Sequence, residues 1–191
     1  MKPRIAAGAK LALCVGLAGA LASCERPYLT WTPREPLSAR RGRVAIAVED
    51  HRPDRGSLGR VFGWGGVPRE IAVGSDHVRE RIERLAKEAT VTAGLGRGQP
   101  AEPPTARLRL DVDALGCDGL GARAHATLSV RLSIAAPDGA PRLAPTVIDT
   151  RGDGRGCQAA FEGALDLLLD ELAARLVDGP AHDAALGNTA A

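Results

Sequence analysis

The stretch Arg107-Leu108-Arg109-Leu110-Asp111-Val112-Asp113-Ala114 alternates polar and apolar residues without a break. The same alternation returns over residues 122–134, with small and aliphatic residues on one side and polar residues on the other. Successive side chains of a strand point to opposite faces, so both stretches are expected to be strands with one buried face. Asp118-Gly119 marks a turn between them and Pro137-Asp138-Gly139 marks the next turn, which makes the strands antiparallel.

On the N-terminal side of these strands, the sequence predicts a strand, a hairpin and a helix. Residues 43–49 are apolar on both faces, as expected of a covered strand, and turn-forming residues follow. Residues 58–73 are typical of a loose hairpin around Gly63-Trp64-Gly65-Gly66. Ser75-Asp76 is expected to cap a helix that runs to about Thr92. Its apolar stripe consists of Val78, Ile82, Leu85, Ala86 and Ala89.

On the C-terminal side, the sequence predicts a short strand and a second helix. The strand lies around residues 146–149, and the glycine-rich run 152–156 is expected to be a flexible connection. The helix runs from Cys157 to about Asp178, where Gly179-Pro180 stops it. Its apolar stripe consists of Phe161, Leu165, Leu168, Leu169, Leu172 and Leu176.

The resulting order (β-α-β-β-β-α) predicts a single α+β domain over residues 42–178. A sheet with one polar face must bury its other face, so we expect a two-layer sandwich. Its sheet would have about four mostly antiparallel strands, with two helices on one face. The crossover through the first helix should leave the first two strands parallel, with a right-handed connection. Residues 179–191 show no period and are expected to be a flexible tail.

The first 23 residues have the parts of a secretion signal. Lys2, Arg4 and Lys10 supply positive charge, and residues 11–21 supply an apolar run shorter than a membrane-spanning helix. Leu21-Ala22-Ser23-Cys24 resembles the bacterial lipobox. The resemblance implies cleavage after residue 23, diacylglycerol on the Cys24 thiol and acylation of the new amine, for example by palmitate. The alternative is ordinary secretion with a chance cysteine.

An acylated Cys24 would anchor the protein to a membrane. Each buried methylene contributes about 0.8 kcal/mol, so two or three acyl chains hold a protein firmly where one does not. Residues 24–41 contain three prolines and are expected to be a tether between the lipid and the domain. Glu25 stands where inner-membrane lipoproteins usually have aspartate, so the resemblance favours the periplasmic face of the outer membrane.

The excess of basic residues belongs to the signal and not to the mature protein. Removing residues 1–23 takes away three basic and no acidic residues, so the formal charge changes from +2 to −1. A mature chain with this charge lacks the basic surface typical of nucleic-acid binding, so no nucleic-acid partner is expected.

Two cysteines remain once the signal is removed and Cys24 carries lipid. Cys117 and Cys157 would lie in an oxidising compartment, where an even number of cysteines favours a disulfide. The predicted strand order brings both to the same end of the sheet. The alternative is two reduced, buried thiols.

Residues with catalytic chemistry occur, but none forms a recognisable site. Asp50, His51 and Asp54 could ligate a metal or transfer protons, yet they lie in a strand-ending turn where aspartate is common. The run 152–156 matches neither phosphate-binding glycine pattern, although an anion at the following helix start is an alternative. No Gly-x-Ser-x-Gly is present. We therefore expect no enzyme activity, no metal and no cofactor.

Two surfaces are candidates for contact with a partner. Phe62 and Trp64 on the predicted hairpin have the residue types of interface anchors; the alternative is that the hairpin covers the sheet edge and Trp64 fills the core. The polar face of the sheet carries a set of arginines, for which the alternative is a plain solvated surface. These are Arg107, Arg109, Arg123 and Arg131.

These segments together resemble the YajG-type family of small bacterial lipoproteins. The resemblance rests on the lipobox, on the first strand running into Val48-Glu49-Asp50-His51-Arg52-Pro53-Asp54, and on Leu58-Gly59 before the glycine-rich hairpin. It covers about residues 43–178 and implies neither enzymatic activity nor catalytic residues. The chain differs from the family in Cys117 and Cys157 and in its long proline-containing arm.

The expected function is therefore that of a non-enzymatic, membrane-anchored envelope lipoprotein of YajG-like type that binds a protein or an envelope polymer. The alternative is an auxiliary lipoprotein of a transport or envelope-assembly system that carries a small or lipidic ligand. A carrier would need an apolar cavity between helices and sheet, beside small residues such as Ala124 and Ala126.

Overall fold

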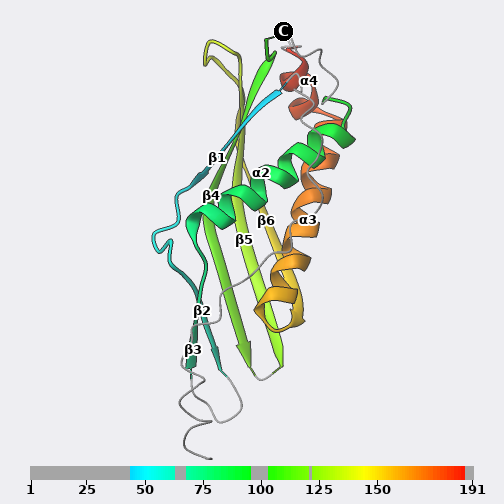
Figure 1. Cartoon of the computed structure of the whole chain (residues 1–191). Coiled ribbons are helices and arrows are strands. Elements are labelled where there is room, and N and C mark those ends of the chain that lie inside the picture. The colour runs from blue at the N-terminus through cyan, green and yellow to red at the C-terminus, as the bar shows by residue number, and fades with distance from the viewer. Residues whose placement is uncertain (1–43, 63–67, 96–102, 121, 188–191) are drawn as a thin grey trace, which may run out of the picture.

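The alternating stretches form long strands at the centre of one sheet (Figure 1). They are β4 (Ala106–Leu120) and β5 (Arg123–Ala135), and β6 (Pro141–Arg155) pairs with β5. Each of the three is antiparallel to its neighbour. The structure, a computed structural model, describes residues 44–62, 68–95, 103–120 and 122–187. The alternating apolar side chains of β4 up to Val112 and those of β5 are buried against the helices, as the alternation predicts.

The remaining strands lie beside β4 or next to β2. β1 (Val44–Asp50) runs parallel to the first half of β4, and β2 (Ser57–Phe62) runs parallel to its last two residues. β3 (Pro68–Ala72) pairs antiparallel with β2, which confirms the predicted hairpin. The sheet order is β3-β2-β4-β5-β6, with β1 on β4. The expected parallel pairing of the first strand with the strand after the helix is confirmed.

β1 differs from the expectation of a strand covered on both faces. Val44 and Val48 are buried, whereas Ala45 and Ala47 are exposed on the other face. The apolar character of the second face therefore comes from small alanine side chains that face solvent. Among the described residues, β1 pairs only with β4 and is an edge strand.

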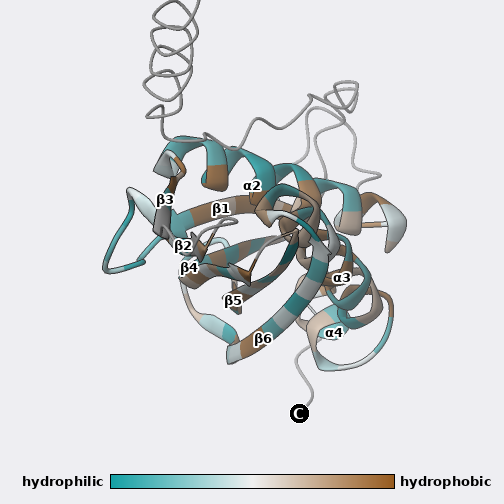
Figure 2. Ribbon diagram, turned by 90° about the horizontal axis from the view of Figure 1, so that it is seen from below, coloured by the Kyte–Doolittle hydropathy of each residue, from teal (hydrophilic) through white to brown (hydrophobic). Residues whose placement is uncertain are grey.

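Helices α2 (Ser75–Thr92) and α3 (Cys157–Val177) pack on one face of the sheet (Figure 2). All five residues of the predicted α2 stripe are buried, and the predicted α3 stripe is buried except for Leu169, which is partly buried. The predicted two-layer α+β sandwich is confirmed. Ser75 does not cap α2, however. Gly74 occupies the cap position without a side-chain hydrogen bond, and the Ser75 hydroxyl donates to Asp50 instead.

The glycine-rich run before α3 is a strand and not the flexible connection that was expected. β6 continues to Arg155, and Gly152 and Gly154 lie directly against the backbone of α3. A Cβ at Gly152 would overlap the carbonyl oxygen of Ala160 and the backbone nitrogen of Ala164. Glycine therefore allows α3 to pack closely on the strand, which is why the run lacks larger side chains.

The turn predicted at Asp118-Gly119 is also wrong, because β4 continues through both residues to Leu120. A β-bulge between Val112 and Ala114 shifts the pairing with β5 by one residue. Beyond the bulge the buried positions of β4 are odd-numbered, and Cys117 is 1% exposed. One extra residue in a strand moves all later side chains to the opposite face.

The C-terminal segment is not the flexible tail that was predicted from residue 179. Residues Pro180–Leu186 form helix α4, with Ala181, Ala184 and Ala185 buried. The Arg142 Nη1 donates to the carbonyl oxygen of Thr105 at 2.9 Å and to that of Ala184 at 3.3 Å. Small alanines that pack closely and one arginine that binds the helix end hold α4 against the sheet.

The predicted disulfide joins Cys117 of β4 to Cys157, the first residue of α3. Their Cα atoms are 6.0 Å apart and the bond closes a loop of sequence separation 40. Both residues are buried, as expected if they arrive at the same end of the sheet. Cys24 and the rest of the signal and tether lie outside the described residues. Trp64 of the predicted hairpin also lies outside them.

Candidate binding surfaces

The polar face of the sheet carries a cross-strand network of charges. Arg109 donates through Nη2 to Glu49 Oε2 at 2.9 Å and through Nε to Asp111 Oδ1 at 2.8 Å. The register places Glu49 of β1 directly opposite Asp111 of β4. The hydrogen bond with Asp111 and the negative charges around it raise the pKa of Arg109, so the guanidinium stays charged. Arg109 is therefore already neutralised by its neighbours.

A second part of the same face is paired in the same way. Arg131 Nη2 lies 2.7 Å from Asp113 Oδ2, and Asp153 interacts with His125 on the neighbouring strand. The hydrogen bond with His125 lowers the pKa of Asp153. Exposed ion pairs of this kind contribute little to stability because solvent screens them. Their main effect is to remove free positive charge from the middle of the sheet.

The four arginines predicted as one binding face do not form one patch. Arg109 and Arg131 are paired, and Arg107 and Arg123 lie toward opposite ends of the sheet because Arg123 stands opposite Leu120. At about 3.3 Å per residue, this separation along β4 is about 40 Å. Only Arg123 lies close to Phe62, through the pairing of both with Leu120.

The three residues considered for metal binding, Asp50, His51 and Asp54, do not share one environment. Asp50 is buried, whereas His51 and Asp54 are exposed. Asp54 Oδ1 accepts hydrogen bonds from the backbone nitrogens of Gly56 and Ser57, as expected of a turn. His51 faces outward with Glu49 and Asp111, and the potential ligand atoms of these three lie within 4.8 Å of one another. Arg109 donates to both carboxylates, so cross-strand ion pairing accounts for this group.

Asp50 points into the protein and forms a buried ion pair that the sequence did not indicate. Arg52 donates through Nε to Asp50 Oδ1 at 2.9 Å and through Nη2 to Oδ2 at 2.7 Å. The Ser75 hydroxyl donates to the same Oδ2 at 2.7 Å. Burial alone would raise the pKa of Asp50, but the hydrogen bonds from Arg52 and Ser75 outweigh it and lower the pKa to about 2. The pair joins the end of β1 to the start of α2.

We expect the stability of the domain to depend on Asp50 between pH 4 and 2. The ordinary pKa of 3.8 applies to the unfolded chain and about 2 to the folded chain. A lowered folded-state pKa stabilises the protein above the unfolded pKa, and the stabilisation is lost as the pH falls through the folded value. The shift corresponds to about 2 kcal/mol. Urea unfolding of wild type and Asp50→Asn from pH 7 to 2 measures it.

The difference in unfolding free energy between the two proteins should be constant above about pH 5 and should shrink by about 2 kcal/mol below pH 4. Asp54→Asn is the matched control, because Asp54 lies in the same turn and is exposed. A difference for Asp50→Asn that does not change with pH would contradict the lowered pKa.

One end of the sheet exposes apolar side chains beside unpaired arginines. Leu120 is 76% exposed and Phe62, its partner on β2, is 44% exposed. Leu120 stands directly opposite Arg123 of β5, and Arg123 stands directly opposite Arg155 of β6. Because directly opposite residues point to the same side of a sheet, all four side chains lie on the same face. Within the described part of the chain, neither arginine forms a salt bridge. We call Phe62, Leu120, Arg123 and Arg155 the strand-end surface.

Sequence reasoning identified Phe62 and Arg123 but missed Leu120 and Arg155. Strict alternation from Leu108 places Leu120 on the buried face, and the bulge after Val112 moves it to the exposed face. No residue type in the strand marks this bulge. Asp118 and Gly119 after Cys117 are turn-forming residues, so no local pattern indicated that the strand reaches Leu120.

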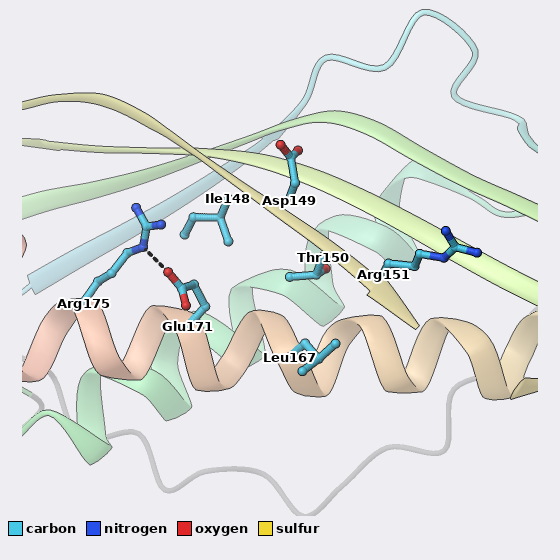
Figure 3. Close-up of a pocket in the computed structure, with 7 residues that line it drawn as sticks. All are labelled: Ile148, Asp149, Thr150, Arg151, Leu167, Glu171 and Arg175. Carbon is cyan, nitrogen blue, oxygen red and sulfur yellow. Dashed lines mark hydrogen bonds and ion pairs between the residues drawn. The ribbon is translucent and has the colours of Figure 1, made fainter. Parts of the chain in front are cut away.

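A pocket of about 340 Å³ lies between the outer strand β6 and helix α3 (Figure 3). Thr150 contributes a buried hydroxyl that has no hydrogen-bond partner in the part of the chain that the structure describes. Arg175 Nε donates to Glu171 Oε1 at 2.7 Å along one wall, and Leu167 is 49% exposed. The other lining residues are Ile148, Asp149 and Arg151. Charged side chains at this opening make it a poor site for an apolar ligand.

The space that a carrier would need beside Ala124 and Ala126 is filled. These side chains are 2% and 0% exposed, and α3 approaches the neighbouring β6 to backbone contact at Gly152. Close packing of this kind leaves no room for a lipidic ligand at that position. None of the described helices is both long and apolar enough to cross a membrane.

No family model matches this chain. No curated protein matches it either. Among solved structures, a protein of family DUF330 from Xanthomonas campestris is similar over 78% of this chain and 92% of its own, with 14% identity and a TM-score of 0.49. A candidate lipoprotein from Caulobacter crescentus is similar over 75% and 93%, with 15% identity and a TM-score of 0.38.

The rare lipoprotein B from Shewanella oneidensis is similar over 75% of this chain and 92% of its own, with 15% identity and a TM-score of 0.33. Likenesses at these values give no basis for transferring an activity or a partner. The residues of this chain must therefore indicate its function.

Proposed function

We propose that this protein is a bacterial lipoprotein, anchored in the cell envelope through acylated Cys24, whose domain binds a partner protein without catalysis. The observation that carries the binding role is the strand-end surface. An exposed leucine and phenylalanine on neighbouring strands, bordered by two arginines that form no salt bridge with any described residue, are typical of an interface core with a charged rim. The partner is expected to present an apolar patch flanked by acidic residues.

The anchor is supported by the sequence before the domain. Leu21-Ala22-Ser23-Cys24 follows a charged start and a short apolar run, in the order of a lipoprotein signal. The YajG-like type and the periplasmic face of the outer membrane belong to the same proposal, the latter through Glu25. Partner binding by surface contact is consistent with an absence of enzyme activity, which is also part of the proposal.

Replacing Cys24 with alanine is expected to abolish lipidation and release the protein from the membrane fraction. The mature wild-type protein should carry the mass of two or three acyl chains, and firm anchoring requires at least two such signals. Intact-mass spectrometry and cell fractionation measure both effects. Cys14→Ala is the control, because this cysteine lies inside the signal and should leave acylation unchanged. Wild-type protein that retains residues 1–23 would contradict the anchor.

A photo-crosslinking residue at position 120 is expected to capture a discrete protein in living cells. The same residue at Ala140, an exposed position in the turn before β6, should capture none. Charge reversal at Arg123 and Arg155 together should lower the yield about tenfold or more, as expected for paired interface charges. Capture of an envelope polymer in place of a protein, or equal yields at both positions, would contradict the proposal.

A further inference from the structure

The outer edge of β6 is a long strand edge to which another strand could pair. β6 has 15 residues and, within the described part of the chain, pairs only with β5. An uncovered edge of this length presents a row of free backbone donors and acceptors, and proteins usually block such an edge. Pro145 has no backbone N–H and therefore interrupts the row of donors in the first half of this edge, but residues 146–155 contain no proline. The free edge therefore requires an explanation.

We propose that β6 pairs antiparallel with β6 of a second copy of this chain, with Thr150 of both copies on a two-fold axis. A two-fold axis perpendicular to the sheet keeps the helices of both copies on the same face. In this register Asp149 of one copy stands directly opposite Arg151 of the other, and the reverse pair forms on the other side of the axis. The two sheets would join into one.

Charge complementarity selects this register over its neighbours. Centring the pair on Asp149 places two aspartates opposite each other, and centring it on Arg151 places two arginines opposite each other. Both arrangements are destabilised by like charges. Centring on Gly152 also pairs opposite charges, but it reaches the start of α3 after only about seven paired residues. The axis at Thr150 allows about 11 paired residues, from Pro145 to Arg155.

The pocket beside β6 lies at the proposed axis. Among the described residues of its own chain, the Thr150 hydroxyl has no hydrogen-bond partner, and a rotation about χ1 would let the two Thr150 hydroxyls bond each other. Leu167 lines the same pocket and is 49% exposed (Figure 3). A second copy would bring two such leucines together on the helix side of the joined sheet. On the opposite face it would cover Val147, which is 50% exposed.

Disulfide trapping in the cell envelope tests this register in the full lipidated chain. Thr150→Cys should form an intermolecular disulfide on mild oxidation, because residues directly opposite on antiparallel strands have Cβ atoms about 5 Å apart. Thr146→Cys is the matched control on the same strand and face. The proposed register separates the two Thr146 positions by about eight residues, or about 26 Å, so this variant should form no intermolecular disulfide.

Charge exchange provides the second arm of the test. In the Thr150→Cys background, Asp149→Arg or Arg151→Asp alone should reduce the trapped dimer about tenfold, because each single change creates two like-charge pairs. The double exchange should restore trapping to near the starting yield. Circular dichroism melting of each purified variant shows that the fold is retained.

Each possible result either supports the β6–β6 dimer or contradicts it. Trapping at Thr150 with rescue by the double exchange supports the proposed dimer. Sedimentation of the detergent-solubilised mature protein as a monomer, trapping at Thr146, or a double exchange that weakens trapping further would overturn it. An axis at Gly152 would separate the two Thr150 positions by about four residues, or about 13 Å, so it predicts no trapping at Thr150, a result that also overturns the proposed register.

Discussion

An alanine at position 152 is expected to destabilise the domain by at least about 3 kcal/mol, at the upper end of the usual cost of overpacking. The new Cβ would overlap the carbonyl oxygen of Ala160 and the nitrogen of Ala164, which are backbone atoms of α3. Backbone atoms cannot rotate away as a side chain can, so the helix must move off the sheet. The free energy of urea unfolding, followed by circular dichroism, measures the change.

Gly163→Ala is a control at the same helix–strand contact. A Cβ at Gly163 would meet Gly152 Cα at 3.5 Å, an ordinary van der Waals distance. Alanine is favoured over glycine in a helix by about 1 kcal/mol, so this variant should be as stable as the wild type or more stable. Two variants of equal stability would show that the helix does not approach the strand as closely as described.

Removing the disulfide is expected to cost about 4 kcal/mol. Cys117→Ala with Cys157→Ala opens a loop of sequence separation 40, and the chain-entropy relation assigns this value to a loop of that size. For a single domain of this length, such a loss is a large part of the total stability. Urea unfolding of the double variant and of the wild type under oxidising conditions measures it.

Reducing agent provides the control for that measurement. It should lower the stability of the wild type by a similar amount and leave the double variant unchanged. Free-thiol titration of the unfolded, unreduced protein should find neither Cys117 nor Cys157 reactive. A wild type insensitive to reductant, with both thiols titrating, would show that the two buried cysteines are not bonded.

The layers of this fold follow from residue periodicity, whereas several interactions between elements do not. The stripes of α2 and α3 and the alternation of β4 and β5 are local patterns, so each can be read from a few turns of chain. Which residues of β1 face which residues of β4 depends on register, and no local pattern sets it. The pairing of Glu49 with Asp111, and hence the network around Arg109, was therefore unpredictable.

Two features were misinterpreted because one residue type has two structural uses. Glycine is common in loops, but at Gly152 it lets a helix pack closely on a strand, and only the position of α3 distinguishes these uses. Pro180 correctly marks the end of α3, but it is also the first residue of α4, where proline is favoured. The alanines that follow Pro180 become buried only where another part of the fold packs against them.

Leu120 shows how a small irregularity changes a functional interpretation. A single bulge reverses the faces of about the second half of β4, so Leu120, which strict alternation would bury, is exposed. The three other members of the strand-end surface come from β2, β5 and β6. Sequence alone cannot bring them together, because their proximity results from sheet pairing.

The parallel course of β1, β2 and β4 determines how far the domain can reach. Val44 stands beside Ala106 and Phe62 beside Leu120, so the chain enters at one end of a sheet that extends about 45 Å to the other. If Cys24 is embedded in lipid, the arm attaches at the near end and Phe62 is presented at the far one. A partner would then contact the domain about one sheet length away from the point where the arm joins it.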